Sequence, residues 1–130
     1  LRAFNRIATN GNGTIGSGIY AKVARQAGIE LMVPDAEHQS KVMNAIYGER
    51  GVKAGFTDGE CREELLAAVA HLVERGARAV ILGCTELPLI LQADEAFEVA
   101  GHYVALLDPT EILAKKCVQL GLAHGQAYQP

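Results

Sequence analysis

The stretch Ala79–Leu82 reads AVIL, and Gly83–Leu87, which reads GCTEL, follows it directly. Four consecutive apolar residues are typical of a strand that is buried on both faces, as in a parallel sheet. The residues that follow change abruptly to a glycine, a thiol, a hydroxyl and a carboxylate. Because ligands bind at the carboxyl ends of the strands in open parallel sheets, this segment predicts a central strand that ends at a functional loop.

Strands and helices are expected to alternate on both sides of this segment. Short apolar runs, helical spacing and closing glycines predict an α/β fold: a three-layer domain with a central parallel sheet of about four strands. The other expected strands are Ala3–Ala8, Ile29–Val33 and His102–Leu107, and the expected helices are Ser17–Ala27, 35–48, 58–76 and one from Asp108 to about Gly121.

Single residues suggest where some of these helices begin. Asp35 is expected to cap the second helix and Asp58 to open the third, since both are good N-cap residues. Pro88 suits the first turn of a further helix just after Cys84. The second helix is expected to face the core with Val42, Met43, Ile46 and Tyr47.

Composition and charge limit the class of protein. The 130 residues suit one domain, expected at 13–122 between an atypical segment 1–12 and a loose tail 123–130. The 12 basic and 15 acidic residues give a formal net charge of −3 without blocks of one sign, which argues against nucleic-acid binding. No apolar run approaches the ~18 residues that span a bilayer, and no signal peptide or membrane contact is expected.

Three cysteines without a paired spacing indicate free thiols in a reducing compartment, so we expect a cytoplasmic protein. The chain begins at Leu1 rather than at methionine. We therefore expect either a piece of a longer protein or a chain that has lost its first residues.

The glycine-rich stretch Gly11–Gly16, which reads GNGTIG, matches the dinucleotide pattern G-x-G-x-x-G, and Asp35 ends the next expected strand. A nucleotide site is one interpretation. A second is a plain turn that caps the following helix. A third is a carboxylate site, in which Thr14 and backbone N–H groups bind an anion at the helix N-terminus.

Cys84 is the strongest candidate for chemistry, because it lies just past a buried strand and before an expected helix start. Backbone N–H groups and the helix dipole at such a position lower a thiol pKa from ~8.5. The alternative is a buried structural cysteine. Cys61 and Cys117 lie inside expected helices and are interpreted as structural.

The remaining polar residues are less informative. The four histidines do not cluster along the sequence and no pair has i, i+4 spacing, so no metal site is expected. No arginine follows Cys84 closely, as a phosphatase-type loop requires. Lys53 lies in a glycine-flanked loop and is either a ligand for an anion or an ordinary solvated lysine.

Several of these stretches together resemble the aspartate/glutamate racemase family, over about Gly13–Leu120. The segment Gly83–Leu89 is similar to the family's second catalytic cysteine motif. The other similar stretches are Gly13–Tyr20, Val33–Pro34 with the following helix, Val52–Gly55 and Leu107–Glu111.

The resemblance implies a cofactor-independent racemase of acidic amino acids. Family members have two similar α/β domains, and each supplies one cysteine, since inversion of Cα needs a base on one face and an acid on the other. By resemblance, Cys84 is one proton carrier, Thr14 and Thr85 hold the α-carboxylate, and Lys53 pairs with the side-chain carboxylate. Glu86 is also assigned to substrate binding.

No stretch resembles the family's first domain or its first cysteine motif, and neither Cys61 nor Cys117 ends a strand. We therefore expect an exposed apolar surface, completed by a homo-oligomer or by a missing N-terminal domain. The chain alone is expected not to racemise aspartate or glutamate. The alternative function is a carboxylate- or nucleotide-binding α/β module without catalysis.

Overall fold

The computed structural model describes residues 6–9 and 18–125, which form a sheet with strand order β2-β1-β3-β5-β4. The strands β1 (Arg6–Thr9), β2 (Glu30–Met32), β3 (Ala79–Ile81) and β5 (His102–Leu107) run parallel, and β4 (Asp94–Val99) is antiparallel to β5 at the edge. Four parallel strands are thus present as expected, and β4 adds a fifth strand. The first strand is Arg6–Thr9 rather than Ala3–Ala8, and residues 3–5 of that prediction lie outside the described residues.

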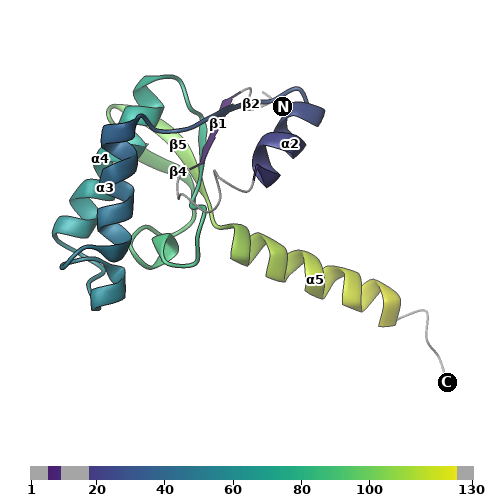
Figure 1. Ribbon diagram of the computed structural model, residues 1–130. Helices are drawn as coiled ribbons and strands as arrows, with labels where there is room; N and C mark the ends of the chain where they lie inside the picture. The colour runs from purple at the N-terminus through teal and green to yellow at the C-terminus, as the bar shows by residue number, and fades with distance from the viewer. Residues whose placement is uncertain (1–5, 10–17, 126–130) are drawn as a thin grey trace.

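The helices cover both faces of the sheet, so the three-layer prediction is confirmed (Figure 1). α3 and α4 pack together on one face, α2 lies on the other, and α5 extends away from the body (Figure 1). The helices are α2 (Ile19–Gln26), α3 (Ala36–Tyr47), α4 (Glu60–Glu74) and α5 (Pro109–Gly125), with short 3₁₀ helices η1 (Val52–Ala54) and η2 (Leu87–Leu89).

Local signals in the sequence set most helix ends. The Asp35 carboxylate accepts a hydrogen bond from the His38 N–H at 2.9 Å and so caps α3, as predicted. α2 is followed by Gly28 at φ +70°, a conformation that favours glycine. Asp58 does not open α4; it accepts a hydrogen bond from the Gly59 N–H, and the helix begins at Glu60.

The core lies between the sheet and the α3–α4 pair. Val80 and Leu82 are fully buried, which confirms the central position of this strand. Tyr47, however, is 65% exposed, so its assignment to the core is wrong. The buried stripe of α3 runs through Ala45 and Ile46, and the next residue is turned by about 100° around the helix and faces outward.

The strand β4 was missing from the sequence prediction. It forms a hairpin with β5 through Ala100 and Gly101, both with positive φ, which suits the twist of a tight hairpin. Phe97 and Val99 pack against the core while Glu98 points out. This period-two pattern is a strand signal, but the polar start at Asp94 obscures it.

The last helix differs from its prediction in length and in environment. α5 continues past Gly121 and ends at Gly125. The first three residues of the expected tail, 123–125, are therefore helical. No residue of α5 is buried, and Leu113 and Leu122 are 63% and 67% exposed. The expected exposed apolar surface is therefore present, on a helix that contacts little else (Figure 1). Within the described residues, no helix is long and apolar enough to cross a membrane.

Candidate functional site

Cys84 lies where the sequence placed it, just beyond the carboxyl end of β3. The Leu82 N–H donates to the Leu107 carbonyl oxygen at 2.9 Å, so the chain leaves β3 beside the end of β5. The chain then turns, and the Cys84 N–H donates a hydrogen bond to the Leu82 carbonyl oxygen at 3.0 Å. The thiol therefore stands at the edge of the sheet where ligands of parallel α/β folds bind.

η1 brings Lys53 to the same edge. Its Nζ atom lies 2.7 Å from Glu86 Oε1. The turn that starts η1 depends on Gly51, because a Cβ there would lie 2.8 Å from the backbone oxygens of Asn44 and Ala45. Glycine thus allows the chain to pass close under the end of α3 and present the lysine to the loop after β3.

Glu86 is the electrostatic centre of this site. The ion pair with Lys53 is the main cause that lowers the pKa of Glu86 to about 2, and hydrogen bonds from the Cys84 thiol and the Thr85 hydroxyl act in the same direction. The Thr85 Oγ1 atom donates to Glu86 Oε2 at 3.1 Å. In turn, Glu86 raises the pKa of Lys53. Both groups are therefore charged at neutral pH.

The thiol of Cys84 does not have the lowered pKa expected from the sequence. Burial raises its pKa, and the Glu86 carboxylate that accepts its hydrogen bond raises it further. The N–H groups of Glu86 and Leu87 act in the opposite direction without prevailing. The expected helix after Cys84 is only the three-residue η2, too short to supply a useful dipole. At neutral pH, Cys84 is a protonated thiol that donates to a carboxylate.

The structure brings together three other predicted site residues around Cys84, namely Lys53, Thr85 and Glu86. Thr14 and the Gly11–Gly16 loop lie outside the described residues, so the nucleotide and helix-terminus interpretations of that loop stay predictions.

The other two cysteines differ from each other. Cys61 is 1% exposed, its sulfur donates to the Asp58 carbonyl oxygen at 3.3 Å, and burial raises its pKa. Its structural role is confirmed. Cys117 is exposed on α5, so the prediction that it is a packed structural residue does not fit the described chain.

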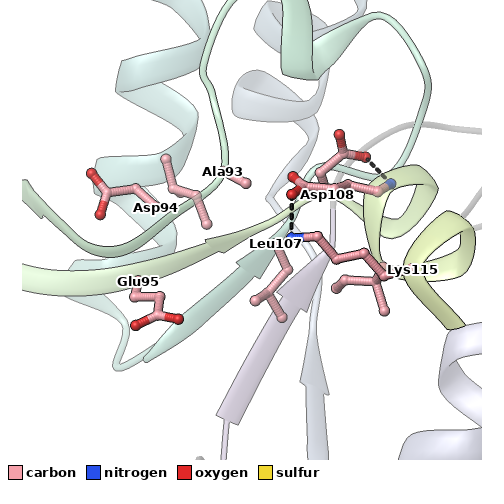
Figure 2. Close-up of a pocket in the computed structure, with 9 residues that line it drawn as sticks. Ala93, Asp94, Glu95, Leu107, Asp108 and Lys115 are labelled. Atoms are coloured by element: carbon pink, nitrogen blue, oxygen red, sulfur yellow. Dashed lines mark hydrogen bonds and ion pairs between the residues drawn. The ribbon is translucent and has the colours of Figure 1, made fainter. Parts of the chain in front are cut away.

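A cavity of about 280 Å³ opens beside this edge, between β4, the end of β5 and the start of α5 (Figure 2). Asp94, Glu95, Asp108 and Glu111 line it, with Lys115 as the basic residue among its lining groups. Asp108 is engaged in capping α5, since its carboxylate accepts from the Thr110 N–H at 2.9 Å. This acidic lining repels carboxylates and lacks Cys84, so the cavity is not the candidate site for an acidic substrate.

Two histidines that are far apart in the sequence meet between α3 and α4. The rings of His38 and His71 stack with centroids 3.9 Å apart and planes 4° from parallel. The expectation that the histidines do not cluster is therefore wrong. The sequence carried no signal for this contact, because it follows only from the antiparallel packing of the two helices.

The sequence matches the Asp/Glu/hydantoin racemase family over residues 6–117. The chain belongs to this family. The match covers β1 to most of α5, including Lys53 and the loop with Cys84. The resemblance noted in the sequence is thus confirmed.

Known proteins are similar to this racemase-family chain in sequence and in fold. It is 38% identical over 112 residues to an uncharacterized protein in the pnlA 3′ region of Pectobacterium carotovorum subsp. carotovorum, covering 85% of this chain and 69% of that protein. The fold matches a crystal structure from Yersinia pestis classed among the Asp/Glu racemases, with a TM-score of 0.75 and 26% identity. An aspartate racemase homologue from Pyrococcus horikoshii matches with a TM-score of 0.68 and 26% identity. The comparison covers 92% of this chain and 49% of each solved structure. The chain therefore spans about half their length.

Proposed function

We propose that this chain supplies one half of a cofactor-independent racemase site for acidic amino acids, with Cys84 as one of two proton carriers. The observation that carries the proposal is the Cys84–Glu86–Lys53 arrangement at the carboxyl edge of the sheet, in a member of this family. Racemisation removes the Cα proton on one face and returns a proton on the other. A single thiol can only return the proton to the face from which it came.

The protonated state of Cys84 suits the acid half of this reaction. A thiol that is neutral in the free protein can deliver its proton to a substrate carbanion directly, leaving a thiolate. In the free protein the neighbouring Glu86 carboxylate raises the pKa of the thiol and so helps to keep Cys84 protonated. In the opposite direction of turnover, the thiolate acts as the base.

Lys53 and Thr85 supply polar groups for an acidic substrate. A lysine ammonium has three N–H donors, so Lys53 can keep its contact with Glu86 and still bind a substrate carboxylate. The Thr85 hydroxyl and Thr14, by resemblance, hold the α-carboxylate. Glu86, ionised and acceptor-only, suits the substrate ammonium group.

The second proton carrier is proposed to come from a second copy of the chain or from an N-terminal domain. Among the described residues, Cys84 is the one thiol at the carboxyl edge of the sheet, since Cys61 is buried in the first turn of α4 and Cys117 lies on α5. The exposed apolar side chains of α5, including Leu113, are the proposed contact surface. A homo-oligomer or an N-terminal domain would cover them and bring the opposite thiol.

A second candidate function is a binding module that holds a dicarboxylate without turning it over. Among the described residues one thiol lies at the carboxyl edge of the sheet, and this favours the alternative because racemisation needs two proton carriers. The two functions are separated by incubating the chain with L-aspartate and L-glutamate in D₂O. Mass spectrometry then reads deuterium at Cα, and chiral chromatography reads the D enantiomer.

The half-site proposal predicts slow deuterium incorporation without accumulation of the D form, and loss of incorporation in Cys84→Ser. Cys117→Ser is the matched control and should behave as the wild type. Absence of exchange, with binding retained in calorimetry, would instead establish the binding module. Exchange that persists in Cys84→Ser would contradict the proposed role of this thiol.

A further inference from the structure

A cluster of three potential metal ligands lies between the start of α3 and the end of α4. It consists of Asp35, His38 and His71, and one ligand atom from each lies within 4.8 Å of the other two. His38 Nδ1 is 2.6 Å from Asp35 Oδ1, and His71 Nε2 is 3.5 Å from Asp35 Oδ2. The two imidazoles are about one-fifth exposed and the carboxylate about half exposed. The cluster is therefore partly buried and still accessible to solvent.

This cluster is separate from the candidate racemase site. The amide of Asn44, later in α3, donates to both oxygens of Glu64, earlier in α4, at 2.8 Å. Together with the contact of His38 and His71, this pairing shows that the two helices run antiparallel. The histidines thus lie at the opposite end of the pair from η1 and Lys53. The two histidines take no part in the proton transfer that is proposed for Cys84.

The chemistry of the three groups fits one class of ligand. Two imidazoles and one carboxylate, with water in an open position, form a donor set typical of zinc sites. Asp35 is already held in place, because its carboxylate accepts the His38 N–H that begins α3. We propose that Asp35, His38 and His71 bind a divalent transition-metal ion of the zinc class, with solvent completing the coordination.

Binding requires three local adjustments. The Asp35 backbone N–H, which donates to His71 Nε2 at 3.4 Å, must release that nitrogen. The nitrogen lone pairs lie in the ring planes, so the stacked imidazoles must turn apart before both can face one ion. Such rotation is inexpensive, because the χ2 torsion of histidine has a broad energy minimum. Arg75 Nη1, which is 3.3 Å from His71 Nε2, must withdraw, and its hydrogen bond to the Val33 carbonyl oxygen at 2.8 Å can hold it to one side.

The surroundings favour a neutral His71, the form that coordinates a metal. Burial lowers the pKa of His71, and the neighbouring His38 acts in the same direction. Asp35 acts in the opposite direction, while hydrogen bonds from His38 lower the pKa of Asp35 itself. Both directions favour the states in which the Asp35 carboxylate and the His71 imidazole can act as ligands.

The test uses the full 130-residue chain with Cys84→Ser and Cys117→Ser, which removes the two accessible thiols that also bind such metals. Isothermal titration with Zn²⁺ and visible absorption of Co²⁺ measure affinity, stoichiometry and ligand type. We expect one ion per chain, and a tetrahedral Co²⁺ spectrum that lacks a thiolate band. The affinity should fall at least tenfold in His38→Gln and in His71→Gln. His102→Gln, at an exposed histidine on β5, is the matched control and should bind as before.

The variant Asp35→Asn separates loss of a metal ligand from loss of folding. Asparagine caps a helix about as well as aspartate, so circular dichroism should be unchanged while metal affinity falls. The proposal is overturned if neither ion binds the chain that carries the two thiol substitutions, or if both histidine variants bind as tightly as that parent chain. None of these readouts uses racemase activity, so failure here leaves the proposed function untouched, and the reverse also holds.

Discussion

The Lys53 ammonium lies 2.7 Å from the Glu86 carboxylate, although the two residues belong to separate loops after α3 and β3. The same carboxylate accepts a hydrogen bond from the Cys84 thiol. Glu86 therefore couples a cation to the candidate proton carrier. A substrate carboxylate that binds Lys53 would weaken this coupling and alter the environment of the thiol.

Replacing Lys53 by methionine should raise the pKa of Glu86 from about 2 toward its ordinary value of 4.5, because the ion pair is the largest cause of the shift. A lowered native pKa means that the unfolded chain binds the proton more readily. The resulting stabilisation is present above pH 4.5 and is lost as the pH falls toward about 2.

Urea unfolding at several pH values checks this expectation. At pH 6 the free energy of unfolding of the wild type should be higher than that of Lys53→Met by a small margin, since Lys53 is half exposed and solvent weakens the pair. The difference should vanish near the lower end of that pH range. Lys41→Met, which removes an exposed pair with Glu37 on α3, serves as the control. An equal pH profile in both variants would contradict the coupling.

The rate at which each thiol is labelled should follow its exposure and the charges around it. Cys117 is exposed, Cys84 is half-buried beside a carboxylate, and Cys61 is buried. With iodoacetamide at pH 7.5, mass spectrometry should find Cys117 modified first and Cys61 last. Glu86→Gln should speed modification of Cys84, because it removes a group that raises the thiol pKa. Unchanged labelling of Cys84 in this variant would show that burial alone controls the thiol.

Gly51→Ala should disturb the site from a distance. The new Cβ would lie 2.8 Å from backbone oxygens of Asn44 and Ala45, so η1 must shift and Lys53 with it. We expect a loss of ~1–3 kcal/mol in unfolding free energy, the usual cost of overpacking. The pKa of the Glu86 carboxyl group, measured by ¹³C NMR, should rise at the same time because the ion pair with Lys53 is weakened.

Gly121→Ala is the matched comparison for that change. Nothing lies near the position of its added Cβ, and the residue is inside α5. Alanine is the better helix former by about 1 kcal/mol, so this variant should be as stable as the wild type or more so. Equal effects of the two substitutions would mean that the close approach at Gly51 is not what positions η1.

The sequence was most informative where one local rule decides the outcome. The apolar run through Val80 and Leu82 gave a buried central strand, and Asp35 gave a helix cap. It was least informative where tertiary contacts decide. The raised thiol pKa of Cys84 depends on burial and on a carboxylate fixed by a lysine from another loop. The contact of His38 with His71 depends on how two helices pack.

The exposed surface of α5 should drive self-association of the isolated chain. Leu113 and Leu120 are 63% and 49% exposed on a helix with no buried residue, and apolar patches of this kind mark interfaces. Sedimentation velocity should show dimers or larger species that dissociate in the double variant Leu113→Glu, Leu120→Glu. Because neither side chain belongs to the buried core, circular dichroism should show the helix content of the wild type. Gln119→Glu adds a charge to the same helix and should leave association intact. A wild-type chain that stays monomeric at high concentration would argue against α5 as a contact between copies, and would favour an N-terminal domain as its natural cover.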